Sequence, residues 1–284
     1  MAKYKIINGE GIIPDGTTKI EDDAFSWSHE LKSITIPTSV TKIGEGAFDR
    51  CEALTSVNIP KSVTEIGAGA FSGCYALTCI NIPNSVTKIG AWAFPECKAL
   101  TSINIPESVT EIGEGAFASC CALTSIIVAE GNKVYDSRGN CNAIIETKTN
   151  RLIQGCTNTV IPESVTEIGT WAFRGCKALT NITIPNSVTE IDNSAFQECE
   201  ALSSITLPES VEKIGYWVFC DCENLKEIVL RHTDPSQIDV SDAGNLGAKQ
   251  ATLYVPKEGV AAFQKDPFWS KCAAIKPITD EMLK

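Results

Sequence analysis

Cysteine and histidine are the residues of this 284-residue sequence with the widest range of possible chemistry, and it contains thirteen cysteines but only two histidines. A zinc site needs close pairs such as C-x-x-C, whereas Cys120 and Cys121 are adjacent and Cys220 and Cys222 are separated by one residue. An odd number of cysteines cannot pair completely within one chain. We therefore predict no metal site and no cofactor.

Other catalytic arrangements are equally hard to find. His29 and His232 lie near opposite ends of the sequence, and we interpret both as ordinary surface residues. There is no P-loop, no G-x-S-x-G and no H-E-x-x-H motif. We predict that the chain is not an enzyme and has no catalytic residue.

Composition excludes further classes of function. The net charge of −11 disfavours nucleic acid and anionic membrane surfaces as partners, because both are polyanions. No apolar run reaches the ~18–20 residues of a membrane-spanning helix, and the first residues lack the apolar core of a secretory signal. The 43% hydrophobic content is sufficient for a substantial core.

The sequence segments that contain these residues form a repeat. Each unit opens on an Ile-Pro or Leu-Pro step, and the units are 23 residues long except for a gap of 56 between Ile105 and Ile161. The eight units begin at Ile13, Ile36, Ile59, Ile82, Ile105, Ile161, Ile184 and Leu207. A fixed period of this length predicts a solenoid of stacked turns, in which each column of the repeat becomes a ladder.

Two ladders are predicted to build the core. One consists of phenylalanines: Phe25, Phe48, Phe71, Phe94, Phe117, Phe173, Phe196 and Phe219. The other consists of cysteines, with Ser28 in that column of the first unit: Cys51, Cys74, Cys97, Cys120, Cys176, Cys199 and Cys222. A ladder cysteine has two equivalent neighbours and no unique partner, so we predict buried thiols whose S–H groups point at loop carbonyls.

Other columns predict local geometry. Segments such as "LTSVNIP" alternate as a short strand should, and a following proline ends the strand. Gly44 is predicted to take a positive φ at a corner, where other units carry Glu21 or Asp192. A charged column alternates in sign from Lys42 to Glu111, which favours correct register; the pairs Lys19–Lys42 and Glu167–Glu190 break the alternation.

The pattern L-T-S-x-x-I-P-x-S-V-T-x-I-G-x-x-A-F-x-x-C-x-A resembles the BspA-like leucine-rich repeat over about residues 13–230. The resemblance implies a β-rich, right-handed leucine-rich-repeat solenoid with a parallel strand ladder and short helical or 3-10 turns. It also implies a bacterial surface or secreted protein that binds host matrix proteins, other bacteria or extracellular ligands. It implies no enzyme chemistry.

The repeat also predicts how the chain is divided. Residues 1–12 form an N-terminal cap and residues 13–230 the eight-unit solenoid. Residues 231–284 resemble the end-piece often found on proteins of this family, which implies a C-terminal cap with a strand at Thr252–Pro256 and a helix near Glu258–Lys265. An insertion at about 128–160 contains a predicted β-hairpin, "NAIIE" and "RLIQG". This insertion is either a protruding recognition element or a decoration that shields the stack.

Two surfaces are candidate binding sites. Outward strand positions are small and polar, and predict either a broad, weak binding face or a simple scaffold: Ser56, Asn58, Asn81, Ser102, Asn104 and Thr183. A column two places before each phenylalanine contains Trp92, Trp171 and Trp217, which are either anchors for a partner or a sugar, or covers that seal the core. Asn181-Ile182-Thr183 fits the glycosylation pattern but falls in a predicted strand, so we discount it.

The sequence thus predicts a monomeric, non-catalytic adhesion module that binds a protein or polysaccharide ligand. The family resemblance places it at the cell surface or among secreted proteins, with any signal missing from this sequence. The alternative is an intracellular scaffold, cytoplasmic if Met1 is the native start, which the many thiols favour.

Overall fold

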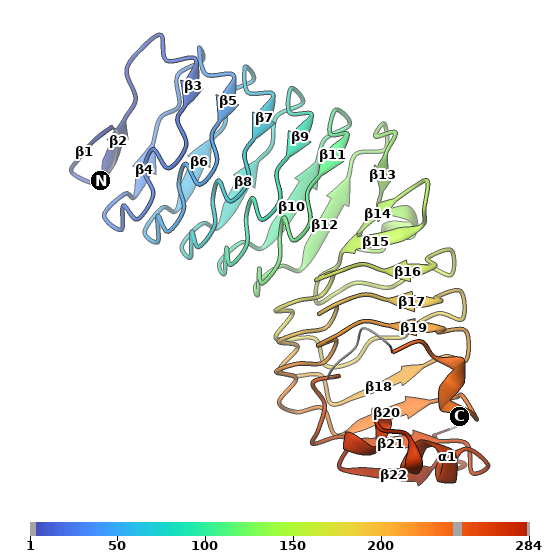
Figure 1. Ribbon diagram of the computed structural model, residues 1–284. Helices are drawn as coiled ribbons and strands as arrows, with labels where there is room; N and C mark the ends of the chain where they lie inside the picture. Colours follow the sequence, from blue (N-terminus) through green and yellow to red (C-terminus); the bar gives the residue numbers. More distant parts are fainter. Residues whose placement is uncertain (1–3, 241–245, 283–284) are drawn as a thin grey trace. The chain divides into compact units, whose positions relative to one another are not determined.

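The structure is a computed structural model that describes residues 4–240 and 246–282. Its turns form a β-solenoid of about eleven turns, built from short strands and a few helical or 3-10 turns (Figure 1). Contacts within the chain define two compact units. Unit 1 comprises the residues up to Lys148 and Gln154–Cys156, and unit 2 comprises Thr149–Ile153 and the residues from Thr157 onward.

Unit 1 contains one continuous parallel ladder of short strands and a second face whose strands pair in separate groups. The short-strand ladder has two residues from each turn: β3 (Lys19–Ile20), β5 (Lys42–Ile43), β7 (Glu65–Ile66), β9 (Lys88–Ile89) and β11 (Glu111–Ile112). The strand face carries β4 (Ser33–Ile34), β6 (Ser56–Asn58), β8 (Cys79–Asn81), β10 (Ser102–Ile105) and β12 (Ser125–Val128). Equivalent residues of neighbouring units pair, as Ile43 does with Ile66, so the predicted register is confirmed.

The N-terminal end of unit 1 is covered by an antiparallel hairpin of β1 (Lys5–Ile7) and β2 (Glu10–Ile12). Strand β2 continues in parallel onto β4. The ring of Tyr4 stacks on the first core phenylalanine, Phe25, at 5.4 Å between ring centroids. Residues that precede the first repeat therefore close the end of the core.

Unit 2 repeats the same plan. Its short-strand ladder comprises β16 (Glu167–Ile168), β17 (Glu190–Ile191) and β19 (Lys213–Ile214), and β15 (Arg151–Gln154) pairs with β16 in parallel. The strand face comprises β18 (Ser204–Leu207), β20 (Glu227–Leu230), β21 (Thr252–Val255) and β22 (Ala274–Pro277). The predicted strand and helix of the C-terminal region are present as β21 and α1 (Val260–Lys265), with 3-10 turns at Pro235–Gln237 and Trp269–Lys271.

The phenylalanine ladder forms as predicted, and all eight rings are fully buried. In unit 1 the ring centroids of successive turns lie 5.0–5.4 Å apart, with interplanar angles of 2–10°. In unit 2 Phe173 and Phe196 stack at 5.1 Å, whereas Phe196 and Phe219 are 5.8 Å apart and inclined by 19°. Parallel offset stacking is thus a property of the repeat, because every turn presents its ring in the same orientation.

The cysteine ladder also forms as predicted. The thiol of Cys51 donates to the carbonyl oxygen of Phe25 in the preceding turn at 3.1 Å, and the same contact recurs from Cys74 to Phe48 at 3.2 Å. Burial raises the pKa of Cys51 to about 12. None of the thirteen cysteines, all of which lie in the described residues, forms a disulfide. The ladder cysteines therefore pack as small apolar residues that also satisfy a buried carbonyl.

The prediction for the corner glycine was wrong. Gly44 does not have a positive φ; the left-handed residue is Gly46, two places later, at φ +57°. Gly44 is required for a different reason, because a Cβ there would lie 2.7 Å from the backbone nitrogen of Asp22 in the preceding turn. Close stacking of turns, not backbone handedness, selects glycine at this corner.

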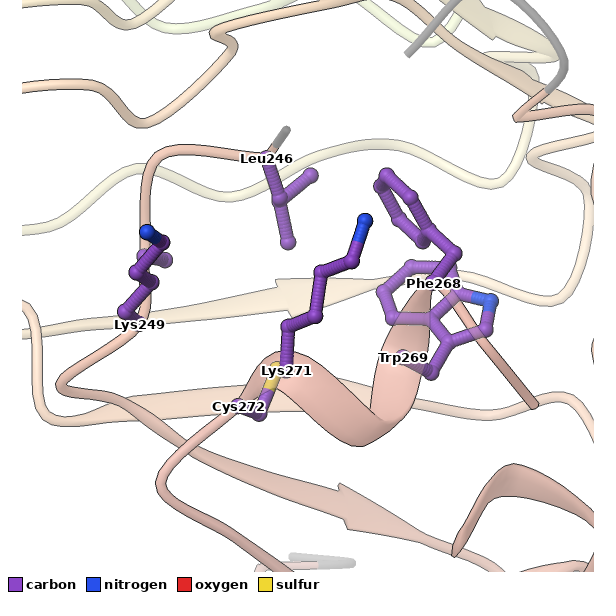
Figure 2. Close-up of a pocket in the computed structure, with 7 residues that line it drawn as sticks. Leu246, Lys249, Phe268, Trp269, Lys271 and Cys272 are labelled. Carbon is purple, nitrogen blue, oxygen red and sulfur yellow. The ribbon is translucent and has the colours of Figure 1, made fainter. Parts of the chain in front are cut away.

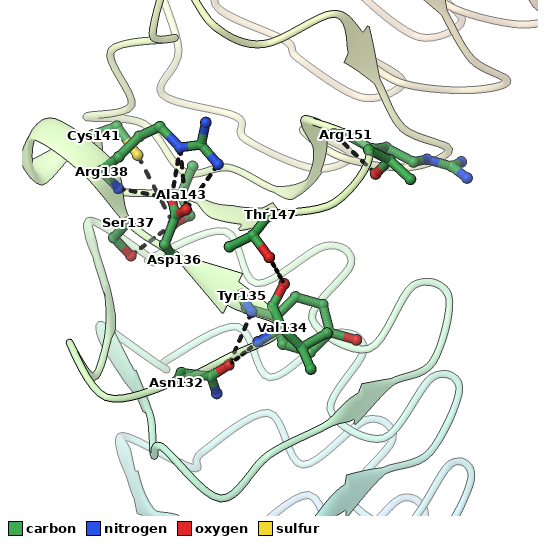
Figure 3. A network of polar contacts seen from close by, with 11 residues as sticks. Asn132, Val134, Tyr135, Asp136, Ser137, Arg138, Cys141, Ala143, Thr147 and Arg151 are labelled. Atoms are coloured by element: carbon green, nitrogen blue, oxygen red, sulfur yellow. Dashed lines mark hydrogen bonds and ion pairs between the residues drawn. The ribbon is translucent and has the colours of Figure 1, made fainter.

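The insertion forms both expected strands, β14 (Ile144–Glu146) and β15, and adds β13 (Tyr135–Asp136), which pairs antiparallel with β14. Figure 3 shows its polar network. The amide of Asn132 donates to the carbonyl oxygens of Pro106 and Val109, and the Tyr135 hydroxyl accepts from the backbone of Ile112 at 3.0 Å. Asn132 and Tyr135 are buried, so this part of the insertion supplies hydrogen-bond partners to backbone groups of the turn that precedes it.

Candidate binding surfaces

The strand face of unit 1 presents the small polar residues that the sequence placed there. Side chains alternate between buried and exposed along each strand, because successive residues of a strand point to opposite sides. The exposed set includes five of the predicted site residues: Ser56, Asn58, Asn81, Ser102 and Asn104. The thiol-bearing side chain of Cys79 lies among them and is also exposed.

The strand face of unit 2 is interrupted at the turn that carries the sixth predicted residue, Thr183. Residues 179–185 form no strand, which corrects the predicted strand over Asn181–Ile184. The backbone ladder between this turn and the next ends where Ser203 donates to Thr180 at 3.4 Å. No strand-ladder pairing therefore joins these residues to β18, so the strand-based reason for discounting the Asn181 glycosylation pattern falls away.

A hollow of about 450 Å³ lies at this interruption, which we call the strand-face groove. Its polar lining comes from Asn181, Thr183, Ser204, Thr206 and Arg231, and Glu163 and Met282 also line it. Asn181, Thr183, Ser204, Thr206 and Arg231 are exposed. The exposed hydroxyl and amide groups of Asn181 and Thr183 thus line the same hollow as the hydroxyl groups of Ser204 and Thr206.

Arg231 is the residue of this groove that the sequence analysis missed. It follows directly on β20, and its guanidinium has neither a hydrogen bond nor an ion pair with any described residue. An arginine fork presents donors in a plane that matches a carboxylate. The sequence offered a weak signal, because Arg231 is the first charged residue after the last repeat unit.

The tryptophan column splits into two environments. Trp92, Trp171 and Trp217 all have positive φ values, between 54° and 59°, as do the glycines of the same column. Trp92 is half-buried, and its ring lies over Gly115 of the next turn, within 3.0 Å of where a Cβ would be. Trp217 is 51% exposed. Trp92 therefore covers a neighbouring turn, as one of the two predicted alternatives required, whereas the Trp217 side chain is exposed to solvent.

A second aromatic surface lies on unit 1, and the sequence analysis did not find it. Trp27 is 61% exposed, and the guanidinium of Arg50 lies 5.3 Å from the centre of its ring. Arg50 donates to the Tyr75 hydroxyl at 2.7 Å, and the Lys98 ammonium lies 4.2 Å from the Tyr75 ring. Aromatic and cationic side chains thus alternate over four successive turns.

A charged cluster at the start of unit 2 explains where the alternation of the charged column fails. Arg151, from the insertion, pairs in register with Glu167 and lies 2.8 Å from its carboxylate and 2.6 Å from that of Asp192. Burial raises the pKa of Glu167 to about 7, an effect that Arg151 opposes and Asp192 reinforces. The insertion therefore supplies the cation that pairs with Glu167, whereas Glu190 pairs with Lys213 of the next unit.

The remaining chemistry is modest in the described residues. His29 is exposed as predicted, whereas the prediction for His232 was wrong: it is 2% exposed, and burial lowers its pKa. A hollow in the C-terminal cap (Figure 2) is lined by Leu246, Phe268 and Lys271 but has a volume of about 10 Å³, room for at most one water molecule. Across residues 4–240 and 246–282 there is no cluster of three or more metal-binding side chains.

Comparison with solved structures shows the same fold in bacterial proteins. A leucine-rich repeat protein from Eubacterium ventriosum matches with a TM-score of 0.73 and 23% identity, over 94% of this chain and 72% of the other. A leucine rich cell surface protein from Faecalibacterium prausnitzii matches with a TM-score of 0.61 and 26% identity, over 94% and 78%. The pneumococcal vaccine antigen PcpA matches with a TM-score of 0.59 and 18% identity, over 92% and 85%.

No curated protein sequence matches the chain. None of its described helices is long and apolar enough to cross a membrane. A family model described as the BspA type leucine rich repeat region, in six copies, matches residues 18–142 and 145–242. The chain therefore belongs to the BspA-type leucine-rich repeat family.

Proposed function

We propose that the protein is a non-catalytic interaction module that binds a segment of a protein ligand in the strand-face groove of unit 2. The observation that carries this proposal is the interrupted ladder between Thr180 and β18, with its open hollow of about 450 Å³. Exposed hydroxyl and amide groups offer hydrogen bonds to a backbone, and Arg231 offers a charge-assisted contact to a carboxylate.

Arg231 favours a ligand segment that places a carboxylate next to it, and Glu163 is the acidic residue that also lines the groove. The overall charge of −11 would repel such a ligand at long range. Arg231 forms no ion pair with any described residue, so a ligand carboxylate can pair with its guanidinium. We expect micromolar affinity and strong dependence on ionic strength for this reason.

The proposal can be tested by panning a random peptide library against the whole chain and measuring each enriched peptide by biolayer interferometry. Thr206→Arg fills the groove, and Arg231→Ala removes the guanidinium. Ser102→Arg places the same bulk on the strand face of unit 1 as a matched control. Loss of binding in both groove variants, with retention in Ser102→Arg, would support the proposal. Peptides that bind all three variants equally would contradict it.

We also propose a cell-surface or secreted location and an adhesion role. Support comes from family membership and from the Faecalibacterium relative, whose name describes a cell surface protein. Expression of the complete gene in its source organism, followed by antibody labelling of intact cells, would test the location.

A specific observation favours the intracellular scaffold as the second candidate. All thirteen cysteines are thiols in the structure, including the exposed Cys79. Reduced cysteines are typical of the cytosol. Counting thiols on protein isolated from its native compartment would separate the two candidates, because a surface protein is expected to have Cys79 oxidised or blocked.

A further inference from the structure

The turns at the ends of β17 and β19 depart from the repeat in unit 2. The corner residue after each short strand is glycine in six of eight units, but Asp192 follows β17. The next column is variable, with Asp22, Glu45, Ala68, Ala91 and Glu114 in unit 1 and Thr170, Asn193 and Tyr216 in unit 2, and Tyr216 is its only aromatic residue. Since the fold accepts alanine in this column, packing does not require an amide or an aromatic ring there.

These residues line a hollow of about 310 Å³, together with Lys213 and Asp239. Tyr216 is 37% exposed, and Trp217 packs edge-on against it at 5.3 Å between ring centroids. A pocket of this volume is within the range of small-molecule sites. It lies on the short-strand ladder, formed by residues other than those of the strand-face groove.

The polar groups of the pocket are held in place by neighbouring turns. The Asp192 carboxylate accepts from Arg151 at 2.6 Å and from the Thr170 hydroxyl at 3.4 Å. The Asn193 side-chain oxygen accepts from the backbone of Tyr216 at 3.0 Å, which leaves the side-chain nitrogen as a donor. Groups that are already oriented lose little entropy when a ligand binds.

Two of the charged groups of the pocket, Asp192 and Lys213, are held in ion pairs, and Asp239 adds a further carboxylate beside Lys213. Arg151 neutralises Asp192, and Glu190 holds the Lys213 ammonium at 2.5 Å. A charged ligand would have to compete with one of these pairs, whereas a neutral ligand would not. Fixed acceptors and donors beside an exposed aromatic ring suit a molecule with many hydroxyl groups and an apolar C–H face.

We propose that this pocket binds a neutral sugar, with one ring face against Tyr216 and its hydroxyls on Asp192, Asn193 and Lys213. Trp217 extends the aromatic surface beyond the pocket, so a second sugar unit can continue over it. The site is independent of the strand-face groove, and a glycan can occupy it whether or not a peptide binds there.

The test uses the whole chain and a panel of methyl glycosides of glucose, galactose, mannose and N-acetylglucosamine, with their disaccharides. Binding is detected by saturation-transfer NMR and quantified by calorimetry. Tyr216→Ala and Asn193→Ala restore the residue that the repeat itself uses at Ala68 and Ala91, so both are expected to fold. Trp27→Ala removes an exposed aromatic ring from unit 1, and Thr206→Arg fills the strand-face groove; both serve as controls.

We expect at least one sugar of the panel to bind the wild type, about tenfold weaker binding in Tyr216→Ala, and several-fold weaker binding in Asn193→Ala. The two controls should bind like the wild type. The proposal is overturned if no sugar of the panel binds the wild type, or if Tyr216→Ala and Asn193→Ala leave the affinity unchanged. Loss of binding in Thr206→Arg alone would assign the sugar to the strand-face groove and equally overturn it.

Discussion

Units 1 and 2 follow one repeat but use it differently. In unit 1 the first corner is Glu21, the next four are Gly44, Gly67, Gly90 and Gly113, and the five phenylalanine rings stack evenly. In unit 2 one of the three corners is Asp192, the last ring pair is looser, and the turn at Thr183 forms no strand. The proposals rest on two hollows, the strand-face groove and the pocket lined by Asp192, Asn193 and Tyr216. Both hollows lie at these departures.

In a repeat protein, functional residues are expected where a unit departs from the repeat. A residue that obeys its column is explained by stacking alone, since the same residue recurs wherever the same contacts recur. A residue that departs from its column has no such explanation. Tyr216 and Arg231 are of this kind, whereas the uniform strand face of unit 1 is accounted for by the fold.

The largest effect is expected from removing a ring in the middle of the regular stack. Phe71→Ala loses two ring neighbours at 5.0 and 5.1 Å in a fully buried site, and should lower the free energy of unfolding by about 3–5 kcal/mol. Phe219→Ala, whose ring neighbour is 5.8 Å away, should cost less. Urea unfolding combined with hydrogen exchange would assign each loss to its unit. Equal losses would mean that the two stacks are equally tight.

The next effect tests the reason for glycine at the corner. A Cβ on Gly90 would lie 2.5 Å from the backbone nitrogen of Ala68, so Gly90→Ala should destabilise unit 1 by about 1–3 kcal/mol. Gly69 has φ +61°, and the nearest atom to a Cβ added there would be 3.9 Å away. Gly69→Ala should therefore cost only about 1 kcal/mol of backbone strain. The reverse order, measured by thermal unfolding, would restore the handedness explanation.

The smallest effect is expected on the pH dependence of the free energy of unfolding, which should differ between the two units because of Glu167. The pKa of Glu167 is raised to about 7, above the ordinary value of 4.5, because of burial. The folded state therefore binds a proton that the unfolded state releases between these pH values, so the stability of unit 2 should rise as pH falls from 8 to 5. Glu167→Gln should remove this dependence and stabilise unit 2 at pH 8 by about 1–2 kcal/mol.

Its control is Glu65→Gln, at the same column of unit 1, where the carboxylate pairs with Lys42 at 2.9 Å. That variant should leave the pH dependence of unit 2 as in the wild type. Unfolding curves at pH 5 and pH 8, followed by hydrogen exchange in residues 160–240, provide the measurement. A pH dependence that survives in Glu167→Gln would assign it to another group.

Most of the fold could be predicted from the sequence. The 23-residue period set the register, and the columns set the buried phenylalanines and the thiols that donate to a carbonyl of the preceding turn. The candidate site was predicted only in outline. Ser56, Asn58 and Trp217 are exposed as a binding residue must be, but Trp92 covers a glycine, and Trp27 and Arg231 were missed.

By itself the sequence determined which residues share a column, because turns of equal length must place like residues on like neighbours. Only the tertiary structure decided the contacts between residues that are not related by the period. Arg151 meets Asp192, which is 41 residues away, and the turn at Thr183 separates from β18 although its sequence obeys the repeat. Such contacts depend on how whole turns settle against one another, and no single column contains that information.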